Sequence, residues 1–405
     1  MHVREAYAFV FGQEAGRMNL NHNKTFYIES LGCITNKTDA ARVETFFKMN
    51  GWSKTSSSEN ASLIILMTCA FTKGSEDYNI NRLRQLRGIK KPESQIAVGG
   101  CLPSISPDRL KKEFNGFVFS PRTLEKLNTF IPSQIKIEKI PPIGFEPKDS
   151  SIKTIRISTG CMGHCTYCAI PFANGRTKSR SIENILRDIR EASESGFRQI
   201  KLVSEDLGAY GQDLNKSIIQ LLEKIVSESI DFELYLDNLN PNWLLRYKQE
   251  LIDIFRSDKV VKKFSIPIQS GSDRILGLMK RSYTVAEVKT ILDDLLRTFP
   301  EVKICTDFIV GFPSETDVEF EETRLLLNAN PYHYVEIFTY EDRPGTKAMN
   351  LTPKILDQVK EERRQLLFKE FLKQFLKSNN IRNTEELKQV MQTRKGLPVH
   401  FNLAV

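Results

Sequence analysis

The sequence contains no apolar run long enough to cross a membrane and no extended apolar core of a secretory signal near its start. A membrane-spanning helix needs about 20 mostly apolar residues, and a signal core needs about 7 to 15. The opening residues "MHVREAYAFVFGQEAGR" hold only a short apolar run flanked by charges. We therefore expect a cytoplasmic protein that does not enter a membrane and whose thiols stay reduced.

Internal repeats are absent, and the only biased segment is the short "SKTSSSEN" at 53–60, which is typical of a surface loop. With 405 residues, 40% of them hydrophobic, the chain is long enough for two or three globular domains. The formal net charge of +8 and the isoelectric point near 9.0 suit a polyanionic partner such as RNA. A generically basic protein would carry the same excess, so charge alone does not identify a partner.

Seven cysteines form an odd set, which argues against a disulfide framework. Three of them lie within "GCMGHCTYC" at 160–168. A closed zinc site usually takes four ligands, yet the next cysteine is Cys305, and His164 is awkwardly placed inside the loop. Tight runs of cysteines also hold iron–sulfur clusters, and three thiolates on a four-iron cluster leave one iron open. The pattern favours such a cluster, with zinc binding or unconnected core cysteines as alternatives.

Alternating β-branched residues at 152–157 predict a strand that leads directly into this cysteine loop. A helix is expected over "SIENILRDIREASES", with Ser181 as its N-cap. Five more strands, mostly separated by helical patterns, are expected at 199–204, 232–237, 264–269, 302–311 and 334–340. Six strands alternating with helices predict an α/β fold with a partial (β/α)6 barrel, in which ligands gather at the C-terminal strand ends.

Two of these strands end in residues that suit a nucleoside cofactor. "LVSEDLGAYG" ends the second strand with Ser204, Glu205 and Asp206, which can bind ribose hydroxyls or an ammonium group. "TDFIVGFP" ends the fifth strand, where the open backbone at Gly311 can hydrogen-bond an adenine edge. Strand-to-loop turns are rich in such residues anyway, so their shared edge is the stronger indication.

The upstream region predicts a second group of cysteines. Strands are expected at 25–32, 62–68 and 94–100, and each is followed directly by a cysteine, namely Cys33, Cys69 and Cys101. In a doubly wound parallel sheet the C-terminal ends of such strands meet at one edge. We therefore expect a second cluster with three thiolate ligands. The seventh, Cys305, lies mid-strand in an apolar setting and is expected to be a small core residue.

The cysteine loop, with the aromatic Tyr167 before its last cysteine, resembles the radical S-adenosylmethionine superfamily. The wider set of motifs resembles one of its branches, the methylthiotransferases, which carry an extra N-terminal cluster domain. The motifs occur in family order over about residues 24–350: "ESLGCITNKTDAARVE", "LMTCAF", "VGGCL", "GCMGHCTYCAIPFANGRTKSRSIE", "IPIQSGSDRILGLMKRSYT", "TDFIVGFPSET" and "RPGTKA".

The resemblance implies two [4Fe–4S] clusters and S-adenosylmethionine as cofactors. Cys161, Cys165 and Cys168 would bind the radical-generating cluster, and Cys33, Cys69 and Cys101 the auxiliary one. The candidate contacts of S-adenosylmethionine are Tyr167, Ser204, Glu205, Asp206 and Gly311. The implied reaction inserts a methylthio group into an unactivated C–H bond: one cofactor molecule methylates a sulfur on the auxiliary cluster, and another is cleaved reductively to a radical that abstracts the substrate hydrogen.

The resemblance also implies a domain order and partners. An N-terminal extension (1–23) would precede the auxiliary-cluster domain (24–145), the radical domain (146–350) and a helical C-terminal segment (351–405). The enzyme would act as a monomer on tRNA or on a ribosomal protein, with a reducing partner such as flavodoxin or ferredoxin.

The C-terminus departs from the family pattern. Members that act on tRNA usually end in a small RNA-binding β-barrel, whereas residues 354–377 read as an amphipathic helix followed by about 25 residues, too few for a closed barrel. "GLPVHFNLAV" could form a strand, so the barrel is expected to be truncated or absent. The basic residues of the helix, with Arg363, Arg364 and Lys373 as the first candidates, would touch RNA or form a solvated face.

The resemblance leaves two branches of the family, with different substrates, as alternatives. "VSEDLGAYGQD" resembles the branch that modifies threonylcarbamoyl-adenosine in tRNA, which we favour. "ESLGC" is also similar to the branch that modifies an aspartate of a ribosomal protein. A third alternative, a non-catalytic iron–sulfur or metal-binding protein, is disfavoured because both cysteine trios are complete.

Overall fold

The computed structural model describes residues 24–142 and 151–379. The expected N-terminal extension at 1–23 and the strand expected within 396–405 lie outside the described residues. The chain divides into two compact units: unit 1 runs up to Lys262 and also includes Glu341–Asn350, and unit 2 comprises Lys263–Tyr340 and the chain from Leu351 on. Within the residues that the structure describes, no helix is both long enough and apolar enough to span a membrane.

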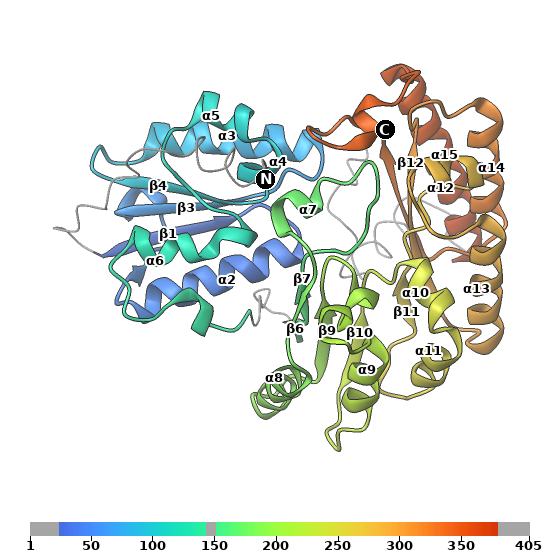
Figure 1. Cartoon of the computed structure of the whole chain (residues 1–405), viewed down its shortest axis with the longest axis horizontal. Helices are drawn as coiled ribbons and strands as arrows, with labels where there is room; N and C mark the ends of the chain where they lie inside the picture. Colours follow the sequence, from blue (N-terminus) through green and yellow to red (C-terminus); the bar gives the residue numbers. More distant parts are fainter. Residues whose placement is uncertain (1–23, 143–150, 380–405) are drawn as a thin grey trace. The chain divides into compact units, whose positions relative to one another are not determined.

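Unit 1 begins with a five-stranded parallel sheet in the order β2-β1-β3-β4-β5 (Figure 1). Its strands are β1 (Thr25–Ser30), β2 (Ser53–Lys54), β3 (Leu63–Thr68), β4 (Gln95–Gly100) and β5 (Phe117–Val118). The three strands expected from the sequence are therefore confirmed as β1, β3 and β4. They are neighbours in the sheet, so their C-terminal ends lie side by side.

Helices cover both faces of this sheet, as expected for a doubly wound domain (Figure 1). Alternate residues of β3 point to opposite faces: Leu63 and Ile65 pack with α2 (Ile34–Met49), while Ile64 and Leu66 pack with α3 (Lys73–Ile89). Both faces of β3 are buried, which explains why its sequence is a nearly continuous apolar run. Shorter helices complete the domain: α4 (Leu102–Ile105), α5 (Pro107–Glu113) and α6 (Leu127–Phe130).

A second parallel sheet of unit 1 has the order β10-β9-β6. It consists of β6 (Ile152–Arg156), β9 (Gln199–Val203) and β10 (Glu233–Leu236), as expected. Ser181 caps α8 (Ile182–Glu194), since its side chain accepts a hydrogen bond from the Asn184 N–H. The other elements are the antiparallel pair β7 (Ser158–Thr159) and β8 (Lys178–Ser179), and the helices α7 (Ile170–Asn174), α8 (Ile182–Glu194), α9 (Ile218–Val226), α10 (Pro241–Arg246) and α11 (Lys248–Phe255).

Unit 2 contains a third parallel sheet, in the order β11-β12-β13, with β11 (Lys263–Ser265), β12 (Lys303–Val310) and β13 (Tyr334–Thr339). The strand expected at 264–269 is shorter because Pro267 cannot donate a hydrogen bond to the ladder. Pairing resumes only as a single bridge between Gln269 and Phe308. The helices that accompany the sheet are α12 (Asp273–Leu278), α13 (Val285–Thr298), α14 (Asp317–Asn328) and α15 (Asp357–Ser378).

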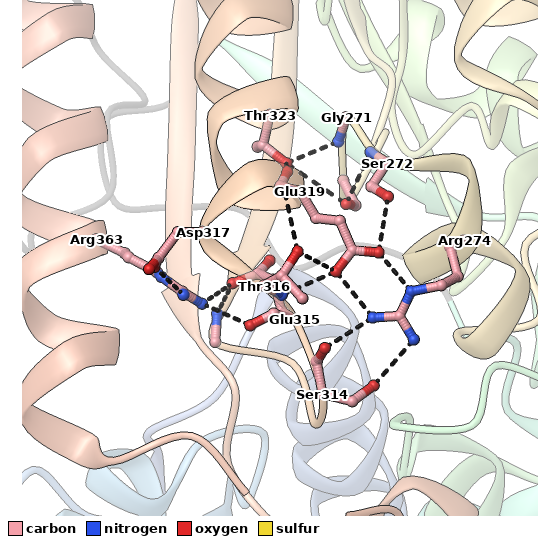
Figure 2. A network of polar contacts seen from close by, with 12 residues as sticks. Gly271, Ser272, Arg274, Ser314, Glu315, Thr316, Asp317, Glu319, Thr323 and Arg363 are labelled. Carbon is pink, nitrogen blue, oxygen red and sulfur yellow. Dashed lines mark hydrogen bonds and ion pairs between the residues drawn. The ribbon is translucent and has the colours of Figure 1, made fainter. Parts of the chain in front are cut away.

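A polar network ties the start of α14 to its neighbours in unit 2 (Figure 2). Thr316 and Glu319 form a capping box, and Glu319 also binds the Arg274 guanidinium through two contacts. On the other side, Arg363 of α15 contacts Glu315 and Asp317, each at 2.7 Å. The contacts of Arg363 hold α15, which follows the last expected barrel strand, against the start of α14.

The α15 helix packs through one apolar face, as its amphipathic pattern predicted. Leu367, Phe371 and Phe375 are buried, and Phe371 lies edge-on to Tyr334 of β13. Arg363 is buried with them, and only 7% of its side chain is exposed. This corrects our expectation for Arg363, which is an internal ion-pair partner and not a surface charge.

Candidate functional site

The first cysteine group, called here the loop trio (Cys161, Cys165 and Cys168), lies between β7 and α7. The loop starts at Gly160, whose φ is +81°. A Cβ at Gly160 would lie 2.3 Å from the carbonyl oxygen of Arg176, so only glycine fits. The Cys161 N–H donates to the Gly175 oxygen at 3.1 Å, which fixes the beginning of the loop against its end.

The loop places two of its sulfur atoms around Gly163. A Cβ on Gly163 would lie 3.2 Å from the Cys161 Sγ and 3.8 Å from the Cys165 Sγ. The Gly163 N–H also donates to the Cys161 Sγ at 3.2 Å. Cys168 follows one turn later, where its N–H donates to the Cys165 oxygen at 3.3 Å. The three cysteines therefore curl around a short, glycine-containing stretch, as a cluster-binding loop requires.

The loop trio lies in an anionic setting. Burial raises the pKa of the Cys161 thiol to about 12, and the charges of Asp206, Cys165 and Glu205 act in the same direction. A bound metal would reverse this, because its positive charge stabilises the thiolate. The donor set thus fits a group that carries cationic iron.

His164, which the sequence already disfavoured as a ligand, is exposed to solvent. Its ring nitrogens lie 3.2 and 3.4 Å from the Arg176 guanidinium. The His164 side chain therefore lies beside the Arg176 guanidinium, on the solvent-exposed side of the loop.

The second group, the sheet trio (Cys33, Cys69 and Cys101), is assembled from three neighbouring strand ends. Cys33 is the N-cap of α2, Cys69 follows β3, and Cys101 follows β4. Burial raises the pKa of the Cys101 thiol well above its usual value, and the charges of Cys33 and Cys69 raise it further. This influence agrees with the strand pairing, which sets the C-terminal ends of β1, β3 and β4 side by side.

Side chains that the sequence did not single out hold the sheet trio in place. Asn36 accepts a hydrogen bond from the Ser30 hydroxyl and donates to the Thr68 oxygen, which links the ends of β1 and β3. Asn79 accepts from the Cys69 N–H at 3.3 Å. A usable signal was present, because "ITNKTD" directly after Cys33 puts polar residues in the first turns of a helix that must pack on a sheet.

In the described ranges, no three His, Cys, Asp or Glu side chains surround one metal-ion position. An iron–sulfur cluster does not need that arrangement, because each thiolate binds a different iron. The seventh cysteine, Cys305, is only partly buried on β12, so our expectation of a core position was too simple.

Four of the five candidate cofactor contacts lie in unit 1, near the loop trio. Tyr167 is part of the loop itself, and Ser204 is buried directly after β9. Both carboxylate oxygens of Glu205 are engaged, one by Arg156 at 2.5 Å and one by the Gly160 N–H at 2.9 Å. Asp206 accepts from the indole N–H of Trp243 at 3.1 Å.

The fifth candidate, Gly311, belongs to unit 2. Its φ is +69°, which opens the backbone at the end of β12 as the sequence suggested. Its N–H donates to the Glu315 carboxylate at 2.6 Å, so its backbone donor already has a protein partner. Burial raises the pKa of Glu315 to about 7, although this N–H and Arg363 oppose the shift.

The segment Glu341–Asn350, which carries "RPGTKA", contacts the surroundings of both cysteine groups within unit 1. The Arg343 guanidinium donates to the oxygen of Ala70, next to Cys69, and pairs with Glu76 at 2.5 Å. Further along the segment, the Ala348 N–H donates to the oxygen of Thr166, inside the cysteine loop, at 2.9 Å. The sequence offered this segment only as a motif without a role.

Family models match two parts of the chain. Residues 155–327 match the radical SAM superfamily, and residues 25–120 match the family described as uncharacterized protein family UPF0004.

Curated relatives are similar over most of the chain. The tRNA-2-methylthio-N(6)-dimethylallyladenosine synthase of Alteromonas mediterranea is 31% identical over 87% of this chain and 78% of its own length. A probable threonylcarbamoyladenosine tRNA methylthiotransferase of Archaeoglobus fulgidus is also 31% identical, over 91% of this chain and 88% of its own.

Solved structures share the fold. The radical S-adenosylmethionine methyltransferase TsrM of Kitasatospora setae matches with a TM-score of 0.58 at 13% identity, over 81% of this chain and 75% of that one. The radical enzyme OxsB matches with a TM-score of 0.51 at 14% identity, over 87% and 56% of the two chains. With both the fold and the relatives in agreement, the chain belongs to the radical S-adenosylmethionine methylthiotransferases, whose fold implies a [4Fe–4S] cluster and S-adenosylmethionine.

Proposed function

We propose that this methylthiotransferase carries a cluster on each cysteine trio and modifies an adenosine next to the tRNA anticodon, of the threonylcarbamoyl-adenosine type. The observation that carries the proposal is that both trios are complete and belong to one compact unit. The names of the relatives support a tRNA substrate.

The loop trio is proposed to hold the cluster that works with S-adenosylmethionine. A four-iron cluster held there by the three thiolates would supply the electron for reductive cleavage of S-adenosylmethionine. The chain contributes Tyr167, Ser204 and Asp206 around this position, and Glu205 orients the loop through the Gly160 N–H. The sheet trio is proposed to hold the auxiliary cluster, because its cysteines follow three neighbouring strand ends and Asn36 ties two of these ends together.

The modified base is proposed from the sequence "SEDLGAYG" together with the relative from Archaeoglobus fulgidus. A dimethylallyl-adenosine substrate is the second candidate, because the relative from Alteromonas mediterranea is equally identical. A ribosomal protein aspartate remains the alternative outside tRNA.

The distribution of charge favours residues 24–142 as the part of the chain that would bind RNA. Residues 24–142 carry 18 lysines and arginines against 11 aspartates and glutamates, so almost all of the chain's net charge of +8 lies there. Lys90, Lys91 and Lys112 belong to the neighbouring helices α3 and α5 or their ends. By contrast, Arg363 is buried in unit 2, which leaves it unsuited to phosphate contacts, while Arg364 is partly exposed and pairs with Glu361 at the surface.

Salt dependence tests this distribution. Each neutralised phosphate releases counterions, so we expect tRNA affinity to fall at least about tenfold between low and physiological salt. Replacing Lys90, Lys91 and Lys112 by Gln should reduce the slope of log affinity against log salt by about 2 to 3. The matched control replaces Lys369, Lys373 and Lys377, an exposed row on α15, and should leave the slope unchanged.

Mass spectrometry of tRNA nucleosides and ribosomal proteins from a deletion strain tests the substrate directly. We expect loss of 2-methylthio-threonylcarbamoyl-adenosine and its return when the wild-type gene is restored, but not with Cys33→Ala. Loss of the dimethylallyl form would select the second candidate. If the nucleosides are unchanged and the protein does not bind tRNA at low salt, the ribosomal protein becomes the proposed substrate.

A further inference from the structure

A fully buried arginine lies between the two cysteine trios in unit 1. Arg156 ends β6, and its side chain is 0% exposed. One guanidinium nitrogen contacts Asp39 at 2.6 Å and another contacts Glu205 at 2.5 Å. A third, Nε, donates to the Ser158 oxygen at 3.3 Å. The cation is therefore fixed on three sides.

Each carboxylate partner leads to a different cysteine site. Asp39 lies in the second turn of α2, the helix that begins directly after Cys33. Glu205 accepts from the N–H of Gly160, the residue before Cys161. An uninterrupted path of helix, ion pairs and one hydrogen bond thus connects Cys33 of the sheet trio with Cys161 of the loop trio.

The electrostatics agree with this position. Burial lowers the pKa of Arg156, but Asp39 and Glu205 outweigh it, and the charge of Cys33 also acts to raise the pKa. The carboxylates in turn raise the pKa of the Cys101 thiol. Arg156 is thus charged while it lies among groups that belong to both sites.

Arginine suits this position better than lysine. Its planar fork can hold two carboxylates at once in fixed directions, whereas lysine is a single point charge on a flexible stem. A buried cation is tolerated only when its partners are well placed, so the three groups constrain one another. Asp39 Oδ2 has no hydrogen-bond partner among the residues that the structure describes, so the bond from Arg156 to Oδ1 anchors this carboxylate.

We propose that Arg156 is a positioning residue that fixes the loop trio relative to the sheet trio. The inference rests on the proposed function, in which both trios serve one substrate. A substrate held between two sites needs them at a constant separation, and a shift of about 1 Å can cost about 100-fold in rate. Loosening Arg156 should therefore let S-adenosylmethionine be cleaved without formation of the methylthio product.

The first test uses the protein without clusters. Hydrogen–deuterium exchange of Arg156→Lys should show residues 34–42 exchanging at least about fivefold faster than in wild type, because α2 loses its tie to β6. Arg363→Lys is the matched control, since Arg363 is also a buried arginine between two carboxylates, Glu315 and Asp317. It should leave exchange in residues 34–42 at the wild-type rate.

The second test uses the reconstituted enzyme. Arg156→Lys should keep the wild-type iron content and still produce 5′-deoxyadenosine, while methylthio product per 5′-deoxyadenosine falls at least about tenfold, the scale expected for a misplaced reacting group. In Arg363→Lys this ratio should equal that of wild type. If Arg156→Lys does not fold, Asp39→Asn carries both measurements, because it removes one of the two ion pairs.

An unchanged ratio with unchanged exchange would overturn the proposal, as would an equal loss in Arg363→Lys. Failure of the proposed function is distinguishable: the wild-type enzyme would then yield no methylthio product, while exchange in residues 34–42 would still report on Arg156.

Discussion

The two cysteine sites of unit 1 are built in opposite ways. The loop trio lies within residues 161–168 of one loop, whose shape depends on nearby glycines and on hydrogen bonds between residues close in sequence. The sheet trio draws on residues 33–101 and exists only when three parallel strands are in register. The first site is thus a local structure, and the second is a product of the fold. Substitutions at the loop trio should consequently damage chemistry alone, whereas substitutions of the buried residues that support the sheet trio should reduce stability as well.

The largest effect is expected from removing the loop trio. Replacing Cys161, Cys165 and Cys168 by Ala should abolish both cleavage of S-adenosylmethionine and product formation. Iron should fall from about eight to about four per chain, because each trio should hold one four-iron cluster. Iron and sulfide analysis after anaerobic reconstitution measures this, and a variant that keeps all its iron would refute the two-cluster assignment.

A smaller, selective loss is expected at the sheet trio. Cys33→Ala should still cleave S-adenosylmethionine with a strong reductant but should make no methylthio product. Cys33 is exposed at the start of α2, so its replacement leaves the apolar packing of the sheet intact. Chromatography of 5′-deoxyadenosine and product separates the two activities. Equal loss of both in Cys33→Ala and Cys165→Ala would show that the sites do not divide the work.

Matched glycine substitutions sharpen the contrast in stability. Gly100 has a φ of +92°, and its added Cβ would lie 2.2 Å from the Thr68 oxygen inside the sheet. Gly160 has a φ of +81° and a similar overlap in the loop. Backbone strain of this kind costs about 1 to 3 kcal/mol. Denaturant unfolding should show the loss for Gly100→Ala, whereas Gly160→Ala should mainly reduce iron binding. The reverse order would contradict our description of the two sites.

The smallest effect is expected at Asn36. Asn36→Ala removes one partner of the Thr68 oxygen, which still accepts from the Cys101 N–H, and one of the Ser30 hydroxyl, so it should cost about 0.5 to 1.5 kcal/mol of unfolding free energy. Asn81→Ala is a suitable control, because its exposed amide oxygen accepts from the Arg84 guanidinium at the surface. A loss in the control as large as in Asn36→Ala would mean that the strand ends do not depend on Asn36.

The same contrast explains what could be predicted from the sequence. The strands before Cys33, Cys69 and Cys101 and the loop around Cys161 were found because apolar runs, alternation and cysteine spacing are local signals. Arg156 was missed because its partners Asp39 and Glu205 lie 117 and 49 positions away. Arg363 was taken for a surface charge for the same reason, since Glu315 is 48 positions away. Pairings of buried charges depend on the fold, so a linear pattern does not reveal them.

The ion pair between Arg343 and Glu76 determines when, during synthesis, the surroundings of Cys69 can be completed. Arg343 is the counter-ion of Glu76, yet the two residues are 267 positions apart in the chain. At a synthesis rate of about 5 to 20 residues per second, roughly 13 to 53 s separate their appearance on the ribosome. The strands of unit 2 are also made in that interval. The surroundings of Cys69 are therefore complete only after Arg343 has been made, so cluster insertion at the sheet trio should follow synthesis of the strands of unit 2.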